Sequence, residues 1–191
     1  GYEGTFIGSN AGAAITTGFS NTIIGANAAD VLTTGDYNTA VGVNALGSED
    51  VGRGSTAVGY GSLATMNSDS NDENTGNTAV GFYSSYNVTT GTNNTSLGFQ
   101  AGMTASDANF NTFIGQDAGK LTTGSNNTIV GAAAGDALTT GQANVALGTS
   151  ALGAATGAVN YCVAVGEGAL AGNLVATGDN PSGAVAIGYQ A

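Results

Sequence analysis

The amino-acid sequence predicts an all-β fold: a parallel β-solenoid, or β-roll, of about eleven 17-residue coils. The first observation is a series of eleven glycines, called the marker glycines below, spaced 17, 17, 17, 22, 17, 17, 16, 17, 18 and 22 residues apart. The second is the short β-branched run before most of them. The third is the total of 33 glycines, which argues against helices because each interior Gly costs a helix about 1 kcal/mol. The marker glycines are Gly8, Gly25, Gly42, Gly59, Gly81, Gly98, Gly115, Gly131, Gly148, Gly166 and Gly188.

One strand per coil is expected in the residues just before each marker glycine. Segments such as 38–42 (Asn-Thr-Ala-Val-Gly) are short and β-branched, which is typical of strands bounded by turns. The residue before the marker glycine is always Ile, Val or Leu, and a Thr or Val stands two positions earlier. Because side chains alternate along a strand, these two columns share one face. We expect both columns to point into the coil.

The residue between those two columns is often large and apolar, as at Phe6, Ile23, Phe113 and Ile129. Large apolar groups on both faces of a strand indicate that both faces are covered. A homotrimer would supply that cover and is the interpretation we favour. The alternative is a wider single-chain solenoid with a second small core.

The turns are predicted from the small and turn-forming residues of each unit. A small residue, usually Ala, stands three positions after the marker glycine, and Asn often opens the strand. Asn and Gly are both frequent turn residues. The whole chain, 1–191, is expected to form one solenoid with coils about 4.8 Å apart. Longer loop insertions are expected near residues 65–76 and 170–183, where the marker spacing rises to 22.

Composition excludes several classes of function. The chain carries 13 acidic residues against Arg53 and Lys120, so it lacks the cations that neutralise phosphates in nucleic-acid binding. No run of 18 apolar residues is present, which argues against membrane insertion. Without His, a Ser-His-Asp or Cys-His catalytic site cannot be built. We expect no enzyme, no catalytic residue and no cofactor, and we expect Cys162 to be a buried thiol.

Two groups of side chains are candidate binding residues. Asp69, Asp72 and Glu73 lie in the first insertion and could bind Ca²⁺ through their oxygens. That segment lacks the spacing and glycine of a calcium-binding loop, so a solvated polar insertion is the favoured interpretation. The second group is aromatic and is expected in or near turns, where it could contact sugars or proteins, or pack against a neighbouring coil or chain: Tyr37, Tyr60, Phe82, Tyr83, Tyr86 and Phe99.

The threonine column supports an alternative function, that of an ice-binding or other ligand-binding solenoid with a regular Thr-rich face. The position of the column decides between the hypotheses: inward for a fibre shaft, outward and coplanar for ice binding. Since we expect the column to point inward, ice binding is the second choice. The column is formed by Thr5, Thr22, Thr39, Thr56, Thr78, Thr95, Thr112 and Thr128, and Val145, Val163 and Val185 continue it.

The repeated units carry a family resemblance. Units such as 77–81 (Asn-Thr-Ala-Val-Gly), with a small residue three positions later and a recurring Thr-Thr-Gly, resemble repeats of phage tail fibres and bacterial surface fibres. They are also similar to the head repeats of YadA-type trimeric autotransporter adhesins, which residues 163–166 and 185–188 match most closely, although the unit here is longer.

The resemblance implies a homotrimeric, left-handed parallel β-roll that serves as a fibre shaft or adhesive head. It also implies an extracellular or virion-surface location and contact with a host surface receptor or glycan. Because the sequence begins and ends within the repeat, we expect either further chain beyond it or end-to-end stacking into a filament.

Overall fold

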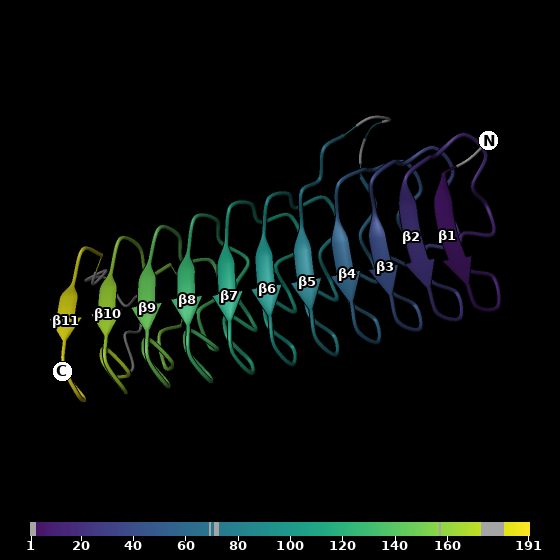
Figure 1. The fold of residues 1–191 in the computed structure, drawn as a ribbon. Coiled ribbons are helices and arrows are strands. Elements are labelled where there is room, and N and C mark those ends of the chain that lie inside the picture. Colours follow the sequence, from purple (N-terminus) through teal and green to yellow (C-terminus); the bar gives the residue numbers. More distant parts are fainter. Residues whose placement is uncertain (1–2, 69, 71–72, 157, 173–181) are drawn as a thin grey trace.

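A computed structural model describes residues 3–68, 70, 73–156, 158–172 and 182–191. Eleven short strands form one parallel sheet, in which their order in space is their order in the sequence (Figure 1). Each strand ends directly before a marker glycine, which confirms the predicted all-β solenoid. The strands are β1 (Gly4–Ile7), β2 (Asn21–Ile24), β3 (Thr39–Val41), β4 (Thr56–Val58), β5 (Thr78–Val80), β6 (Thr95–Leu97), β7 (Thr112–Ile114), β8 (Thr128–Val130), β9 (Val145–Leu147), β10 (Val163–Val165) and β11 (Val185–Ile187).

Each coil consists of one strand and a return path of turns that leads to the start of the next strand (Figure 1). Neighbouring strands pair in register, so that Val41 lies beside Val58. The 22-residue spacing after Gly59 leaves this register unchanged, because Val58 pairs with Val80. Eleven strands bound only ten coils, and the last runs through residues 173–181, which leaves about nine complete turns in the described part, fewer than predicted.

The marker glycines stack directly on one another along the rod. Their φ angles lie between 126° and 141°, a region that glycine adopts readily and other residues rarely do. A Cβ placed on any marker glycine from Gly8 to Gly166 would lie 2.3–2.6 Å from the carbonyl oxygen of the next one. This corner therefore requires glycine both for its backbone conformation and for the close approach of the next coil.

A ladder of buried asparagines runs inside the rod, one position before the threonine column. The side-chain oxygen of Asn94 accepts a hydrogen bond from Asn111 N–H at 3.0 Å, and its amide donates to the carbonyl of Ala108 at 2.7 Å. The sequence predicted these asparagines only as turn residues, and their hydrogen bonds between coils are seen only in the structure. The same backbone-to-side-chain bond links successive members of Asn21, Asn38, Ser55, Asn77, Asn94, Asn111, Asn127, Asn144 and Cys162.

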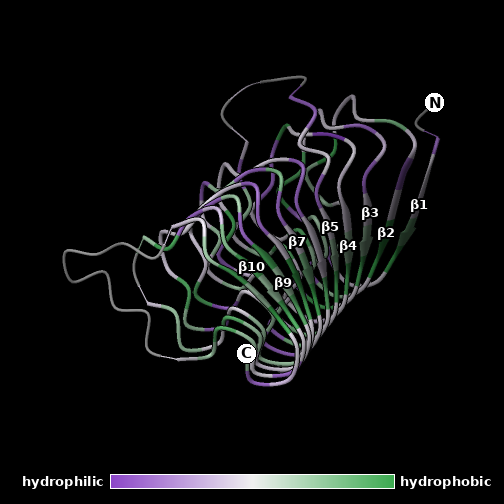
Figure 2. Ribbon diagram, turned by 90° about the vertical axis from the view of Figure 1, so that its left-hand side faces the viewer, coloured by the Kyte–Doolittle hydropathy of each residue, from purple (hydrophilic) through white to green (hydrophobic). Residues whose placement is uncertain are grey.

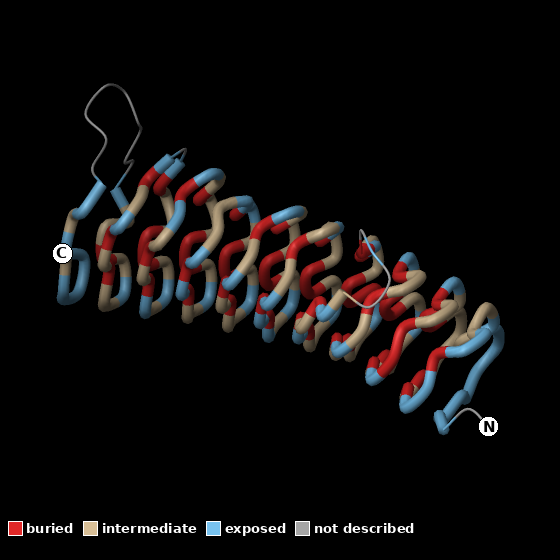
Figure 3. The backbone as a smooth tube through the Cα atoms, turned by 90° about the horizontal axis from the view of Figure 1, so that it is seen from above, coloured by how far each residue is buried: buried red, intermediate tan, exposed pale blue. Residues whose placement is uncertain are grey.

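The core is a narrow column filled by complementary side chains, and it runs along the length of the rod (Figure 3). Where the inward strand residue is large, as at Phe113 or Ile129, the residue six positions later is Gly119 or Gly135, and the large side chain occupies the space that a Cβ would need there. Where the inward residue is alanine, a leucine can take the later position. The buried pairs of this second kind are Ala40 with Leu46, Ala57 with Leu63, and Ala146 with Leu152.

The strand side chains point the opposite way from the prediction. From β2 to β10 the middle residue of the TAV-like triplet is buried. The aliphatic residue before each marker glycine and the threonine two positions earlier face outward. The size of the interior explains this orientation, because at the middle strand position many coils have room only for alanine. The asparagine ladder also shares the parity of the middle residue, and its amides need the buried backbone partners. The prediction that the aliphatic and threonine columns share one face was correct, and the prediction that this face points inward was wrong.

Hydrogen bonds to neighbouring coils are present at both ends of the insertion predicted near residues 65–76. Asn67 N–H still donates to the carbonyl of Thr89 in the next coil at 3.0 Å, and Arg53 N–H donates to the carbonyl of Glu73 at 3.0 Å. Hydrogen bonds between coils are therefore kept on both sides of residues 68–72, of which 69, 71 and 72 lie outside the described residues. The second predicted insertion, 170–183, falls largely outside the described residues.

Replacing Gly98 by Ala is expected to destabilise the protein strongly. The new Cβ would lie 2.4 Å from the carbonyl oxygen of Gly115, at a φ of +140°. Overpacking and backbone strain each cost about 1–3 kcal/mol. Urea unfolding measures the loss. The matched control is Gly172→Ala, whose Cβ would meet nothing within 4 Å. An equal loss in both variants would contradict the stacking requirement.

Replacing Asn94 by Leu is expected to lower the free energy of unfolding by about 2–4 kcal/mol, because buried polar groups left without partners cost about 1–3 kcal/mol each. The affected groups are Asn111 N–H and the carbonyl of Ala108. The control, Asn126→Gly, changes an exposed residue at a φ of 64° and should shift stability by about 0.5 kcal/mol or less. An Asn94→Leu variant as stable as the wild type would refute the role of the ladder.

Candidate functional site

The first candidate site is the outward face of the sheet, called the sheet face below. It consists of two ladders, the aliphatic residues before the marker glycines and the threonine column. Rungs lie about 4.8 Å apart, and the two ladders about 6.6 Å apart, as strand geometry dictates. Neither column contains a charged residue, and Figure 2 shows hydrophobic stretches along the strands. The aliphatic ladder is Ile7, Ile24, Val41, Val58, Val80, Leu97, Ile114, Val130, Leu147, Val165 and Ile187.

The aliphatic ladder leaves apolar side chains open to solvent along the whole rod. In the middle of the rod Leu97 and Leu147 are 46% and 37% exposed, and the other members from β2 to β10 are half-buried. Contiguous apolar patches larger than a few hundred Å² mark interaction sites in soluble proteins. The sheet face offers hydroxyl and aliphatic groups in a regular array and no acid or base, so it is suited to contact and not to chemistry.

The threonine column lies on the same outward face, contrary to the prediction that it points inward. Thr78, Thr95 and Thr128 are exposed, and Thr39, Thr56 and the other members between β2 and β7 are half-buried. This outward position is the one that the ice-binding hypothesis requires of the column. The sheet face therefore combines a row of hydroxyl groups from threonine with a row of aliphatic side chains.

Most of the predicted aromatic residues form a cluster on the turns after β4, β5 and β6. Tyr60, Phe82 and Phe99 follow successive marker glycines, and their rings stack along the rod with centroids 5.3 and 5.6 Å apart and interplanar angles of 13° and 11°. Tyr83 contacts Tyr60 and Tyr86 edge to face, with centroids 5.5 and 4.7 Å apart. The cluster is therefore held by ring contacts between coils.

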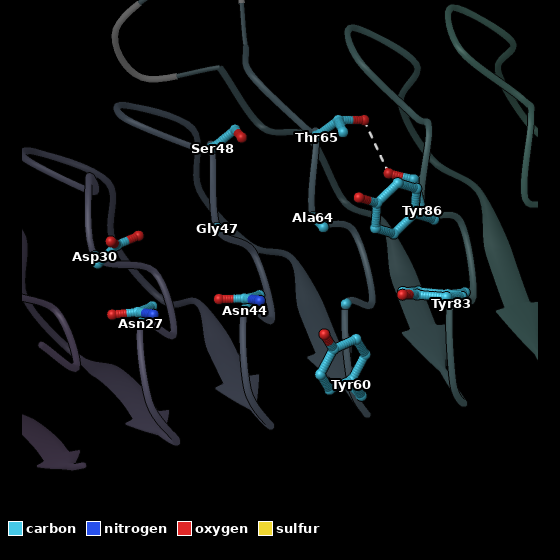
Figure 4. Close-up of a pocket in the computed structure, with 11 residues that line it drawn as sticks. Asn27, Asp30, Asn44, Gly47, Ser48, Tyr60, Ala64, Thr65, Tyr83 and Tyr86 are labelled. Carbon is cyan, nitrogen blue, oxygen red and sulfur yellow. Dashed lines mark hydrogen bonds between the residues drawn. The ribbon is translucent and has the colours of Figure 1, made fainter. Parts of the chain in front are cut away.

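A groove of about 430 Å³ lies beside this cluster, on the turns that follow β2 to β5 (Figure 4). It is the second candidate site. Its tyrosines were predicted from the sequence, whereas Asn27 and Asn44 were not. The signal for these two is the asparagine that stands two positions after the marker glycine in the first three coils. The lining residues are Asn27, Asp30, Asn44, Gly47, Ser48, Tyr60, Gly61, Ala64, Thr65, Tyr83 and Tyr86.

Among the tyrosines of the groove, Tyr83 has a pKa above its ordinary value. Burial raises the pKa of Tyr83, and the phenols of Tyr60 and Tyr86 raise it further. A protonated phenol both donates and accepts hydrogen bonds. Elsewhere, burial also raises the pKa of Asp136, with an added contribution from Asp117.

The weak calcium candidate falls mostly outside the described residues. Asp69 and Asp72 lie outside them, and Glu73 is half-buried with its carbonyl accepting a hydrogen bond from Arg53 N–H. In the described part of the chain, no group of three or more His, Cys, Asp or Glu side chains could hold a metal ion.

One buried carboxylate escaped the sequence analysis. Glu49 is fully buried in the column that holds Leu32 one coil earlier and Met66 one coil later. Its Oε1 accepts hydrogen bonds from Gly52 N–H at 2.7 Å and from the Ser68 hydroxyl at 2.6 Å. Glu49 therefore ties Ser68, within the predicted insertion, to the preceding coil.

Two further predicted residues are placed as follows. Cys162 is a buried thiol, as predicted, and its N–H donates to the side chain of Asn144 at 2.9 Å. Tyr37 lies away from the aromatic cluster and packs edge to face against Phe19, with ring centroids 5.1 Å apart.

Comparisons with protein-family models, curated proteins and solved structures give no match to this chain. The resemblance to tail-fibre and adhesin repeats therefore stays a prediction. Among the described residues there is no helix with the length and apolar character needed to cross a bilayer.

Proposed function

We propose that this chain is a structural and adhesive segment of an extracellular or virion-surface fibre, without catalytic activity. In this proposal the rods associate as a homotrimer, with their sheet faces turned toward a common axis. The observation that carries the proposal is the uncharged sheet face, whose aliphatic ladder stays open to solvent along the whole solenoid.

The geometry of the sheet face supports cyclic association. An uncharged strip that runs along the rod can pack against the same strip on parallel copies around a common axis, and closed cyclic symmetry is the usual outcome for identical subunits. The left-handed coil implied by the family resemblance belongs to the same proposal. End-to-end stacking into a filament would extend the fibre in the direction of the sheet.

The charge distribution also supports association through this face. Each chain has a net charge of −11, so contact through charged surfaces would be repulsive. Because the sheet face carries no ionisable group, copies can bury it without desolvating a charge. The acidic side chains then remain on the outside of the assembly, where they favour solubility.

Replacing Ile114 by Glu is expected to break the assembly. The carboxylate would stand in the middle of the sheet face, where burial of an unpaired charge costs several kcal/mol. Light scattering should give the wild type a mass three times that of the 18.4 kDa chain, and the variant the mass of one chain.

The control for this experiment is Leu121→Glu, which adds the same charge at a residue that is 45% exposed on a turn. It should keep the mass of the wild type. A wild-type protein with the mass of one chain would contradict the homotrimer directly.

Ice binding is the second candidate, favoured by one observation: the outward position of the threonine column. If it is correct, the wild type shapes ice crystals and lowers their growth temperature as a single chain. Thr95→Tyr, which raises one rung above its neighbours, should then reduce this activity severalfold. Val31→Thr, at an exposed turn residue, should leave it unchanged. A wild type without effect on ice removes this candidate.

A further inference from the structure

We infer that the groove between Asn27 and Tyr86 binds an uncharged oligosaccharide. The groove lies on the turns after β2 to β5 and not on the strands. Association of copies through the sheet face would therefore not involve the residues of the groove. The inference deepens the proposed attachment role by naming the class of ligand and its site. It relies on that role only for the biological source of the sugar.

The groove exists because two successive turns, after β3 and β4, carry small residues where the neighbouring turns carry larger ones. Gly47 and Ala64 occupy the column that holds Asp30 in the coil before them and Tyr86 in the coil after them. Gly61 occupies the column of Asn44 and Tyr83. Small residues thus form the floor, and the larger members of the same columns form the ends (Figure 4). The hollow is built by local sequence and is not a gap between moving parts.

Polar groups suited to sugar hydroxyls line this hollow. The phenol oxygens of Tyr60, Tyr83 and Tyr86 are turned to the side on which Asn44 and Ser48 lie (Figure 4). Phenols and primary amides both donate and accept hydrogen bonds, which matches the dual character of a sugar hydroxyl. The raised pKa of Tyr83 keeps its donor proton in place at neutral pH.

Aromatic rings supply the second element of sugar recognition. Sugar rings present apolar C–H faces that pack on aromatic rings, and Tyr joins such a surface to a polar end. Tyr60 is 43% exposed and is stacked on Phe82, which is stacked on Phe99 in turn. Because these contacts fix the tyrosine before a ligand arrives, little side-chain entropy is lost on binding.

The charge of the groove selects against anionic sugars. Its lining contains one carboxylate, Asp30, and no Lys or Arg. Recognition of sulfate, phosphate or carboxylate groups relies on such cations, and the chain has only Arg53 and Lys120. The length of the site favours a chain of sugars, since Asn27, Asn44, Gly61 and Tyr83 span three coil spacings, about 14 Å.

The test uses the full chain and tetrasaccharides of glucose, mannose, galactose and N-acetylglucosamine, with sialylated and sulfated oligosaccharides as charged comparators. Saturation-transfer NMR and calorimetry measure binding up to millimolar ligand. At least one uncharged tetrasaccharide is expected to bind, with perturbed signals from the tyrosine rings. The absence of binding by all four, or preference for a charged comparator, would overturn the inference.

The decisive variant is Ala64→Tyr, which fills the groove from its floor. Tyr86 already occupies this column one coil later, so the solenoid is expected to accept the ring. Affinity should fall at least tenfold, which corresponds to about 1.4 kcal/mol. The matched control is Met103→Tyr, in the same column one coil beyond Tyr86 and outside the groove, which should bind like the wild type.

A second variant keeps the inference testable if Ala64→Tyr fails to fold. Asn44→Gly removes a side chain of the groove at a φ of 56°, a conformation that glycine tolerates and that Gly61 already has in the same column one coil later. The fold should be kept while affinity falls. Undiminished binding in either folded variant would place the sugar elsewhere. The mass of the assembly is measured separately, so a failed sugar site and a failed homotrimer give different results.

Discussion

The stacking of one coil on the next at a fixed register is the constraint on which the structure depends. Two columns impose it: the marker glycines, whose backbones approach too closely for any Cβ, and the asparagines, whose side chains bond to the next coil. Glycine sets the distance, and asparagine supplies buried polar groups with partners. Unit length can then vary between 16 and 22 residues, because only these columns and the strand must match.

The narrow interior determines what appears outside. Each coil has room for only one large side chain at its centre, either the middle strand residue or the residue six positions later. The aliphatic residue before the marker glycine therefore has no space inside. That residue turns outward in every coil, and the sheet face results from the same limit that makes the core so thin. The aromatic groove has a comparable origin, because Gly47, Gly61 and Ala64 interrupt columns that are larger in neighbouring coils.

The sequence was sufficient for the strand positions and the parallel order, because the marker glycines record the period directly. It was insufficient for the side toward which each column points. Alternation separates Val41 from Ala40 but does not say which is buried. The deciding facts were long-range: the amide of Asn38 bonds to the carbonyl of Gly52, 14 residues away, and Leu46 complements Ala40 in volume. The tyrosines were recognisable as surface candidates, whereas the groove depends on small residues that carry no chemical signal.

The identical contacts that the marker glycines and asparagines make from coil to coil have a consequence for the number of repeats. Each coil offers its successor the same contacts that it receives from its predecessor, so a coil can be duplicated or deleted without a new kind of junction. Such changes alter the length of the rod in steps of about 4.8 Å and leave its cross-section and sheet face intact. The length of the rod is thus independent of the chemistry of its sides, and it is determined by the number of repeats.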